Sequence, residues 1–202
     1  MKEGTELREE MIFDIERRIG SGNYGNVYKA IQKGIGRAVA IKELKIPGAS
    51  KLKKETWIQG KLIHPNIVTV FLFDEERGYL VMEYVESSLE SKIKNLGGKI
   101  LAIEEWRVIE IAQSALEALA YAHDHDCKFH GDIKPGNILI TSDWRVKLSD
   151  FGVARSFYEA PSETPGSEAW ASPETLRAWD ERQTWAGEEK SDLFSLGFGT
   201  IL

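Results

Sequence analysis

The sequence has little cysteine and no long apolar run. Its 202 residues include a single cysteine, Cys127, which cannot form a disulfide within the chain. This favours a reducing compartment, so we expect a cytoplasmic, or else nuclear, location. No stretch reaches the roughly 18 apolar residues of a membrane-spanning helix, and the first residues, MKEGTELREEM, contain acidic side chains where a signal peptide has an apolar segment. We therefore expect neither a membrane segment nor secretion.

Positive charge is scarce relative to negative charge. There are 26 Lys and Arg residues against 32 Asp and Glu residues, a formal net charge of −6. Proteins that bind nucleic acids or anionic membranes usually show a basic surface, so we expect no nucleic-acid partner. The length suffices for one large domain or for two small lobes with a buried core.

The most informative stretch is HGDIKPGNILITSDWRVKLSDFG, residues 130–152. Within it, ILI and VKL are typical of short strands, and TSDW is typical of the turn between them. Such a hairpin brings together the polar side chains that flank it: Asp132, Lys134, Asn137 and Asp150. Two carboxylates, an amide and an ammonium suit a site that holds a polyanion and its metal ions while a hydroxyl attacks. Phosphoryl transfer is such a reaction, because its catalysis is mostly positioning and charge neutralisation.

These residues resemble the eukaryotic protein kinases. HGDIKPGN is similar to the family's catalytic loop, HRDxKxxN, and the three residues from Asp150 are similar to its DFG motif. The lysine two residues after Asp132 resembles the serine/threonine branch. The resemblance implies that Asp132 accepts or orients the proton of the substrate hydroxyl, that Lys134 steadies the γ-phosphate of ATP, and that Asn137 completes the catalytic set. It also implies that Asn137 and Asp150 bind Mg²⁺.

A glycine-rich turn precedes this hairpin by about a hundred residues. Residues 12–31 alternate apolar and polar side chains on both sides of a glycine cluster, which predicts strand, turn and strand. The G-x-G-x-x-G spacing is shared with the dinucleotide fingerprint, but a dinucleotide site needs a helix at the last glycine, and NVYKA instead continues as a strand. By the resemblance, this segment supplies five contacts to ATP: Ile19, Gly20, Gly22, Gly25 and Val27.

Further segments resemble the family in the expected order. VAIK at 39–42 is similar to the strand whose lysine contacts the α- and β-phosphates. Residues 50–64 predict a helix, and the resemblance implies that a glutamate of this helix pairs with that lysine. Residues 66–88 predict two strands around an acidic turn, followed by a connector. The resemblance implies that this connector is the hinge whose backbone binds adenine. The remaining nucleotide-binding residues implied by the resemblance are Ala40, Lys42, Glu55, Met82 (the gatekeeper), Glu83, Val85 and Leu139 (the floor under the adenine).

Two positions depart from the family pattern. Gly131 stands where the family usually has an arginine that meets a phosphate on the activation segment. We therefore expect activity not to depend strictly on phosphorylation of that segment. Gln59 stands in a position that is usually apolar, within a stack of side chains that links the two lobes.

The rest of the large lobe predicts structural roles. We expect a core helix over about 103–126, with His123 and His125 at its end, where their i, i+2 spacing does not favour a metal pair. His130 is expected to pack against Phe151, and residues 175–189 are predicted to be a loop. By the resemblance, Ser167 bonds Asp132 and Lys134, and Asp192 bonds the backbone of the catalytic loop. The apolar face of the core helix is predicted at Ile103, Trp106, Ile109, Ala112, Leu116 and Leu119.

Together these features predict an α+β, two-lobed, protein-kinase-like fold. We expect an N-terminal extension at 1–12 and a kinase domain at 13–202, with a small lobe at 13–84 (an antiparallel sheet and one helix) and a partial, mainly helical large lobe at 85–202. The implied activity is phosphorylation of protein serine and threonine by ATP with Mg²⁺. A non-catalytic nucleotide-binding or scaffold module remains an alternative, because the sequence stops within a helix at Leu202, and a small-molecule kinase is a further one. The protein substrate, the oligomeric state, and whether the chain is a fragment or a short mature form stay open.

Overall fold

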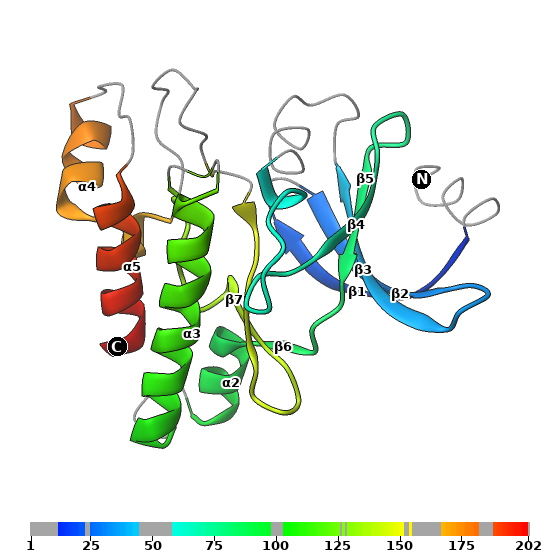
Figure 1. Ribbon diagram of the computed structural model, residues 1–202, viewed down its shortest axis with the longest axis horizontal. Helices are drawn as coiled ribbons and strands as arrows, with labels where there is room; N and C mark the ends of the chain where they lie inside the picture. The colour runs from blue at the N-terminus through cyan, green and yellow to red at the C-terminus, as the bar shows by residue number, and fades with distance from the viewer. Residues whose placement is uncertain are drawn as a thin grey trace. The chain divides into compact units, whose positions relative to one another are not determined.

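The computed structural model describes residues 12–22, 25–44, 58–97, 103–125, 127, 129–151, 154, 167–181 and 188–201. The chain divides into two compact units, Met1–Lys53 with Thr69–Tyr84, and Lys54–Val68 with Val85–Leu202. Figure 1 shows the elements of both. Among the helices described, none is long and apolar enough to cross a membrane.

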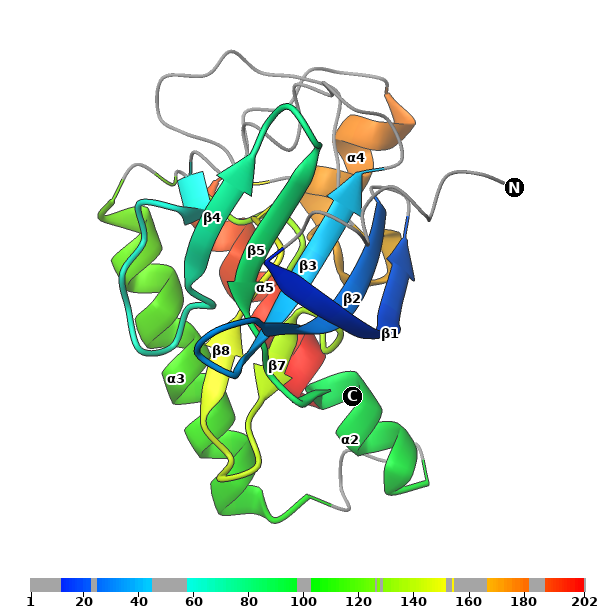
Figure 2. The same cartoon turned by 90° about the vertical axis from the view of Figure 1, so that its right-hand side faces the viewer.

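The first unit is a five-stranded antiparallel sheet. Figure 2 shows its strands side by side in the order β1-β2-β3-β5-β4. The two strands predicted on either side of the glycine cluster are confirmed. One face of the sheet carries a small core of Phe13, Ala30, Val39, Ile41, Tyr79 and Val81. The strands are β1 (Phe13–Gly22), β2 (Gly25–Gln32), β3 (Arg37–Leu44), β4 (Val70–Asp74) and β5 (Tyr79–Glu83).

The second unit combines helices with a small sheet. Helices α3 and α5 lie side by side, and α3 also packs against β8 (Figure 1). The sheet has the order β6-β7-β8, and a parallel bridge between Ile67 and Leu148 adds a short segment on the far side of β8. The elements are β6 (Ser87–Ser88), α2 (Leu89–Asn95), α3 (Glu105–His123), β7 (Ile138–Ile140), β8 (Val146–Leu148), the 3-10 helix η3 (Glu168–Trp170), α4 (Pro173–Asp180) and α5 (Glu189–Ile201).

The segment before β4, up to Val68, belongs to the second unit. The predicted small lobe, residues 13–84, had included this segment. Ile58, Leu62 and Ile67 are buried in the second unit's core, which explains the grouping. The helix predicted to run to His64 ends earlier, since the chain turns after Gln59 with bonds between residues three apart. Glycine follows at position 60, and glycine disfavours helix. The rest of that predicted helix, residues 50–57, lies outside the described residues.

The buried face of α3 differs from the predicted one. Trp106, Ile109 and Leu116 are 49%, 51% and 43% exposed, so the prediction of a core stripe through them was wrong. The prediction followed the large apolar residues, whereas the core-facing positions are mostly alanine, whose small side chain allows α5 and β8 to pack closely. The buried residues of α3 are Ile111, Ala115, Ala118, Leu119 and Ala122.

The predicted loop after residue 174 contains a helix, α4. Pro173 occupies its first position, where proline's missing N–H removes no helical hydrogen bond. The backbone N–H of Leu176 donates to the Ser172 carbonyl at 3.0 Å. Thr175 and Ala178, three residues apart, are buried. Because the buried residues are small, the apolar pattern of this helix is weak in the sequence. The polar composition of the segment therefore led to the prediction of a loop.

Candidate active site

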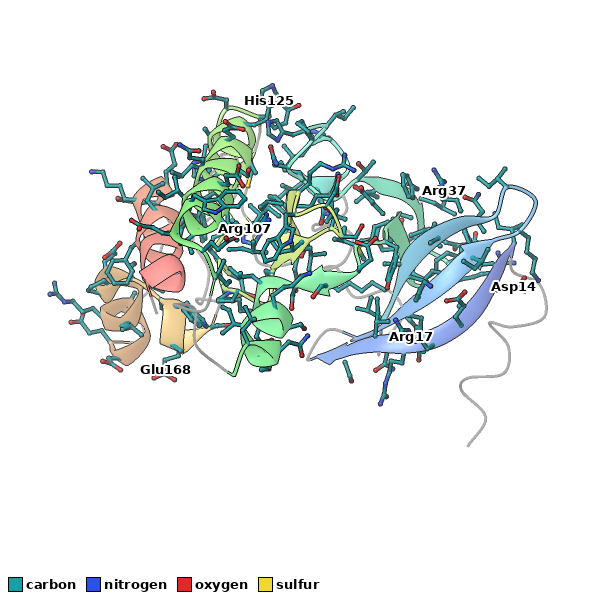
Figure 3. All side chains as sticks on the ribbon, turned by 90° about the horizontal axis from the view of Figure 1, so that it is seen from below. Asp14, Arg17, Arg37, Arg107, His125 and Glu168 are labelled. Atoms are coloured by element: carbon teal, nitrogen blue, oxygen red, sulfur yellow. The ribbon has the colours of Figure 1, made fainter. Side chains whose placement is uncertain are left out.

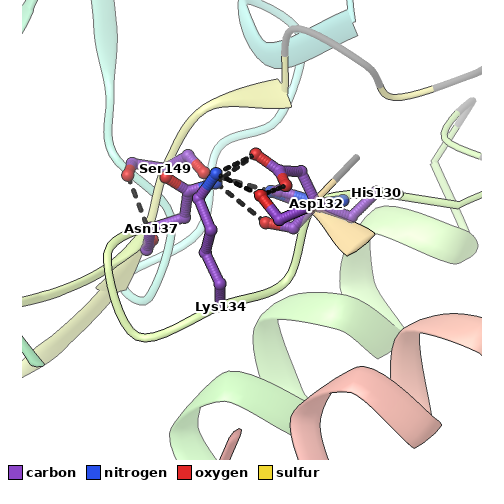
Figure 4. A network of polar contacts seen from close by, with 6 residues as sticks. His130, Asp132, Lys134, Asn137 and Ser149 are labelled. Carbon is purple, nitrogen blue, oxygen red and sulfur yellow. Dashed lines mark hydrogen bonds and ion pairs between the residues drawn. The ribbon is translucent and has the colours of Figure 1, made fainter. Parts of the chain in front are cut away.

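A connected polar network lies in the loop that precedes β7 (Figure 4). Lys134 Nζ lies 2.7 Å from Asp132 Oδ2. Asn137 Nδ2 donates to the same Oδ2 at 2.9 Å and to the Asp132 backbone carbonyl at 2.8 Å. The three residues predicted to act together therefore lie within hydrogen-bond distance, and the ammonium and the amide hold the carboxylate in one orientation.

Ser167, just before η3, completes this network. Its Oγ donates to Asp132 Oδ1 at 2.9 Å and accepts from Lys134 Nζ at 2.8 Å. The predicted contacts of Ser167 with both residues are confirmed. Because each carboxylate oxygen of Asp132 now has a donor, its side chain is fixed by contacts from two separate segments of the chain.

The β7–β8 hairpin brings the predicted metal ligands, Asn137 and Asp150, to neighbouring backbone positions. Ser149, the residue before Asp150, donates from its backbone N–H and from its Oγ to the Asn137 carbonyl, each at 3.0 Å. Asp150 has φ of +65°, a left-handed conformation that few side chains adopt and that Asp tolerates better than most. Such residues gather at functional sites, where the surroundings hold an otherwise unfavourable backbone.

Four residues predicted to contact the nucleotide lie on one face of the first unit's sheet. Val27 pairs with Lys42 across β2 and β3, and Ala40 pairs with Met82 across β3 and β5. Residues paired across antiparallel strands share a face, as do residues two apart along a strand. Ala40 and Lys42 are buried there, on the face opposite the unit's small core. The register thus places a lysine and three apolar side chains together.

The glycine cluster lies at the end of the β1–β2 hairpin. Gly22 pairs with Gly25, and Gly20 pairs with Val27. Ile19 lies at an irregularity in this pairing and is exposed. These positions present backbone and one apolar side chain at the hairpin's end.

The other predicted nucleotide contacts are divided between the two units. Glu83 ends β5, and its backbone N–H donates to the Thr69 carbonyl at 2.8 Å. In the second unit Val85 is buried, and Leu139 is half-buried on β7 between two core-facing isoleucines. Glu55 lies outside the described residues.

Asp192 of α5 holds the backbone of the catalytic loop, as predicted. Its Oδ2 accepts from the His130 N–H at 2.7 Å and its Oδ1 from the Gly131 N–H at 2.9 Å. His130 packs against Phe151 with ring centroids 4.5 Å apart, which confirms its expected structural role. The His130 Nδ1 accepts from the Asp132 N–H at 3.2 Å, so its Nε2 carries the proton that bonds the Ser149 carbonyl at 3.1 Å.

Comparison with known proteins shows to which family the chain belongs. The family model described as "Protein kinase domain" matches residues 13–201. The chain belongs to the protein kinase family. It is 34% identical over 198 residues to "Serine/threonine-protein kinase pakG" of Dictyostelium discoideum, 34% over 200 residues to "Serine/threonine-protein kinase TAO3" of Gallus gallus, and 33% over 200 residues to "Serine/threonine-protein kinase dst1" of Dictyostelium discoideum. Each match covers 95% of this chain but only 16%, 21% and 26% of the respective relative, so the chain spans about a sixth to a quarter of their length.

The kinase domain has an unusual backbone at Gly131. Its φ is +82°, in the left-handed region where an L side chain is strained and glycine is not. The carboxylate of Asp192 bonds the N–H of this residue directly. Glycine therefore suits the turn that the chain makes immediately before Asp132.

Sequence reasoning missed one buried partner of this kinase site. His123, at the end of α3, was considered only as one member of a disfavoured metal pair, yet its Nε2 lies 2.9 Å from Asp192 Oδ2. The two residues are 69 positions apart, so no local pattern could have linked them. His125 is exposed just past the helix, where Figure 3 labels it, and its Nδ1 bonds the Tyr121 carbonyl at 2.7 Å.

The predicted departure at Gln59 has a partner that the sequence did not reveal. Gln59 is buried and its Nε2 donates to the Val68 carbonyl at 2.9 Å. Among the described residues, its buried Oε1 has no hydrogen-bond partner. The bond to the Val68 carbonyl thus satisfies a donor of this buried carboxamide.

Proposed function

We propose that the chain transfers the γ-phosphate of ATP to serine and threonine hydroxyls of protein substrates. The observation that carries the proposal is the closed arrangement of Asp132, Lys134 and Ser167, in which a carboxylate, an ammonium and a hydroxyl hold one another at 2.7–2.9 Å. Membership of the protein kinase family and the similarity to three serine/threonine-protein kinases support it.

The roles follow from the charges in this arrangement. The substrate oxygen forms a bond to the γ-phosphorus, the bond from that phosphorus to the β–γ bridging oxygen breaks, and ADP leaves. Asp132 accepts the proton of the attacking hydroxyl, or orients it, since its carboxylate is held ready by donors on both oxygens. Lys134 lies next to Asp132, so its ammonium can stabilise negative charge on the phosphate that is transferred beside this carboxylate. A small cavity beside Asp132 is lined by Ser167, Trp170 and Thr175 among others.

The donor set suits Mg²⁺. Asn137 points its Nδ2 at Asp132, so its carboxamide oxygen is turned the other way, and Asp150 adds a carboxylate after β8. Both are hard oxygen ligands, and Mg²⁺ in such sites takes one or two protein ligands together with phosphate oxygens. Among the described residues there is no cluster of three or more metal-binding side chains, which fits a metal shared with the nucleotide. When bound, Mg²⁺ would neutralise phosphate charge.

We assign the nucleotide contacts to the residues that the family pattern predicts. On the first unit's sheet, Val27, Ala40 and Met82 offer apolar surface to the adenine, and Lys42 offers a positive charge to the phosphates. By the same pattern, we assign Glu55 as the residue that pairs with Lys42. The other contacts that we assign are Ile19, Gly20, Gly22, Gly25, Glu83, Val85 and Leu139. The presence of a single cysteine, which cannot form a disulfide within the chain, supports a reducing, cytoplasmic or nuclear location for this activity.

Phosphate transfer to a generic basic protein with Mg²⁺ and ATP tests the proposal. We expect transfer by the wild-type chain and a loss of about 10²- to 10⁴-fold for Asp132→Asn, because that change removes the proton acceptor but keeps the side chain's shape. Nucleotide-dependent thermal stabilisation measured on both proteins checks that the variant still binds ATP. Transfer that is unchanged by Asp132→Asn would contradict the enzyme assignment. Stabilisation by ATP without any transfer would favour the non-catalytic module.

A further inference from the structure

The first turn of α2 is attached to the catalytic loop. The backbone N–H of Glu90 donates to the Pro135 carbonyl at 3.0 Å. Ser88 caps the same helix, because its Oγ accepts from the Ser91 N–H at 3.1 Å. The start of α2 is therefore fixed against the loop that carries Lys134.

Gly136 leaves room for the Glu90 carboxylate beside that lysine. A Cβ atom at position 136 would lie 3.6 Å from Glu90 Oε2 and 3.9 Å from Lys134 Cε. Both are ordinary van der Waals distances, so the carboxylate and the lysine stem border the space that a larger side chain at position 136 would fill. Since the residue there is glycine, a group from another molecule can enter this space and meet the carboxylate.

Lys134 connects this space to the proposed proton acceptor. Its Nζ lies 2.7 Å from Asp132 Oδ2 and is one bond away from Cε. Added end to end, these separations place the Glu90 carboxylate no more than about 12 Å from the Asp132 carboxylate. An extended chain rises about 3.3–3.6 Å per residue, so a substrate residue two or three positions from the acceptor hydroxyl comes within reach of Glu90.

The charges around this space favour a cation. The ammonium of Lys134 is already bonded to Asp132 and Ser167. Glu90 Oε1 lies 3.0 Å from Lys94 Nζ, and Oε2 has no hydrogen-bond partner among the described residues. The side chains of Glu90 and Lys94 are 54% and 68% exposed, and such exposed ion pairs are weak. Glu90 is thus able to bind a second cation, and a guanidinium can give its carboxylate two N–H bonds.

We propose that Glu90 is a specificity-determining residue, which binds an arginine or lysine of the protein substrate two or three positions from the serine or threonine that is phosphorylated. The proposal rests on the proposed function and adds a class of substrate to it, the basic peptide. In this account Glu90 touches neither ATP nor the reacting atoms. Its charge should therefore affect the binding of the substrate more than the chemical step.

A set of peptides tests the proposal on the whole chain. Each peptide has one serine, and a single arginine at position −3, −2, +2 or +3 from it, or no arginine. Glu90→Gln removes the charge and keeps the shape of the side chain. Lys94→Gln removes the ion pair and leaves the Glu90 charge. Glu117→Gln is the matched control, because Glu117 is an exposed glutamate of another helix, α3. The kcat and KM of each peptide are measured, and the Kd of the same peptides with a fluorescent label is obtained from anisotropy.

We expect at least one arginine peptide to have a kcat/KM about two- to fivefold above that of the arginine-free peptide in the wild type, which is the range that one exposed charge pair supplies. The difference should lie mainly in KM. It should disappear in Glu90→Gln, persist in Glu117→Gln, and be equal or larger in Lys94→Gln. High salt should weaken it in the wild type, because salt screens exposed charges.

Two results would overturn the proposal. One is the absence of any preference for arginine in the wild type at all four positions. The other is a preference that Glu90→Gln leaves intact, which would mean that the arginine binds elsewhere. If the wild-type chain phosphorylates none of the peptides, the proposed function fails, and the ratio of the Kd values with and without arginine decides the role of Glu90. Equal Kd values in the wild type would then refute that role too.

Discussion

The buried face of α3 can be tested with two isoleucines that lie two residues apart. Ile111 is 3% exposed and Ile109 is 51% exposed. Replacing a buried isoleucine by alanine removes contacts and leaves a cavity, so Ile111→Ala should lower the free energy of unfolding by about 2–5 kcal/mol. Ile109→Ala should change it by no more than about 0.5 kcal/mol, as surface substitutions usually do.

The pair forms its own control, because both changes exchange the same residue types within one helix. Differences in helix propensity therefore cancel between them. Urea unfolding followed by far-ultraviolet circular dichroism gives both free energies by linear extrapolation. Equal losses for the two variants, or a larger loss for Ile109→Ala, would refute the assignment of the buried face and would return the core to the stripe of large residues.

Three further predictions concern single side chains. Burial raises the pKa of Glu174, but hydrogen bonds, including one from Ser191 Oγ at 2.9 Å, lower it more, and the net pKa lies below its ordinary value. Ser191→Ala should raise that pKa in a carboxyl NMR titration. A carboxyl whose pKa is depressed by folding stabilises the fold at pH values above its unfolded pKa, and this stabilisation is lost as the pH falls. The variant should therefore lose less stability on acidification than the wild type. Burial, together with the charge of Asp192, raises the pKa of the Cys127 thiol. A thiol reagent should therefore label Cys127 slowly in the native chain and rapidly in urea. Fast labelling of the native chain would contradict this prediction. Gly131 offers no arginine to an activation-segment phosphate, so phosphatase treatment should leave phosphate transfer largely intact, and abolished transfer would argue against that expectation.

The hairpin of the catalytic loop could be predicted because its information is local. Asp132, Lys134, Asn137 and Asp150 follow one another within twenty residues, and two short strands with a turn between them suffice to bring them together. The β1–β2 hairpin of the first unit was equally accessible, because apolar and polar residues alternate on both sides of the glycine cluster.

Other features could not be predicted, because they depend on what packs against a residue. The alanines on the core face of α3 are too small to stand out in the sequence, and the residues of α4 whose burial is described as complete, Thr175 and Ala178, are small as well. Whether Gln59 would find a partner depended on the path of the chain at Val68, nine residues later. The link between His123 and Asp192 exists only after α3 and α5 have packed together.

The bridge between Ile67 and Leu148 bears on how the small sheet of the second unit avoids association with other chains. On this side of β8, the Val68 N–H donates to the Leu148 carbonyl at 2.9 Å, and the Leu148 N–H donates to the Asn66 carbonyl at 2.7 Å. Pairing with β7 occupies the other side of β8, and the opposite border of the sheet is β6, only two residues long. Long unpaired strand borders are templates for aggregation, and short ones are not. The strand that leads into Asp150 is thus shielded on both sides from strand addition by a neighbouring molecule.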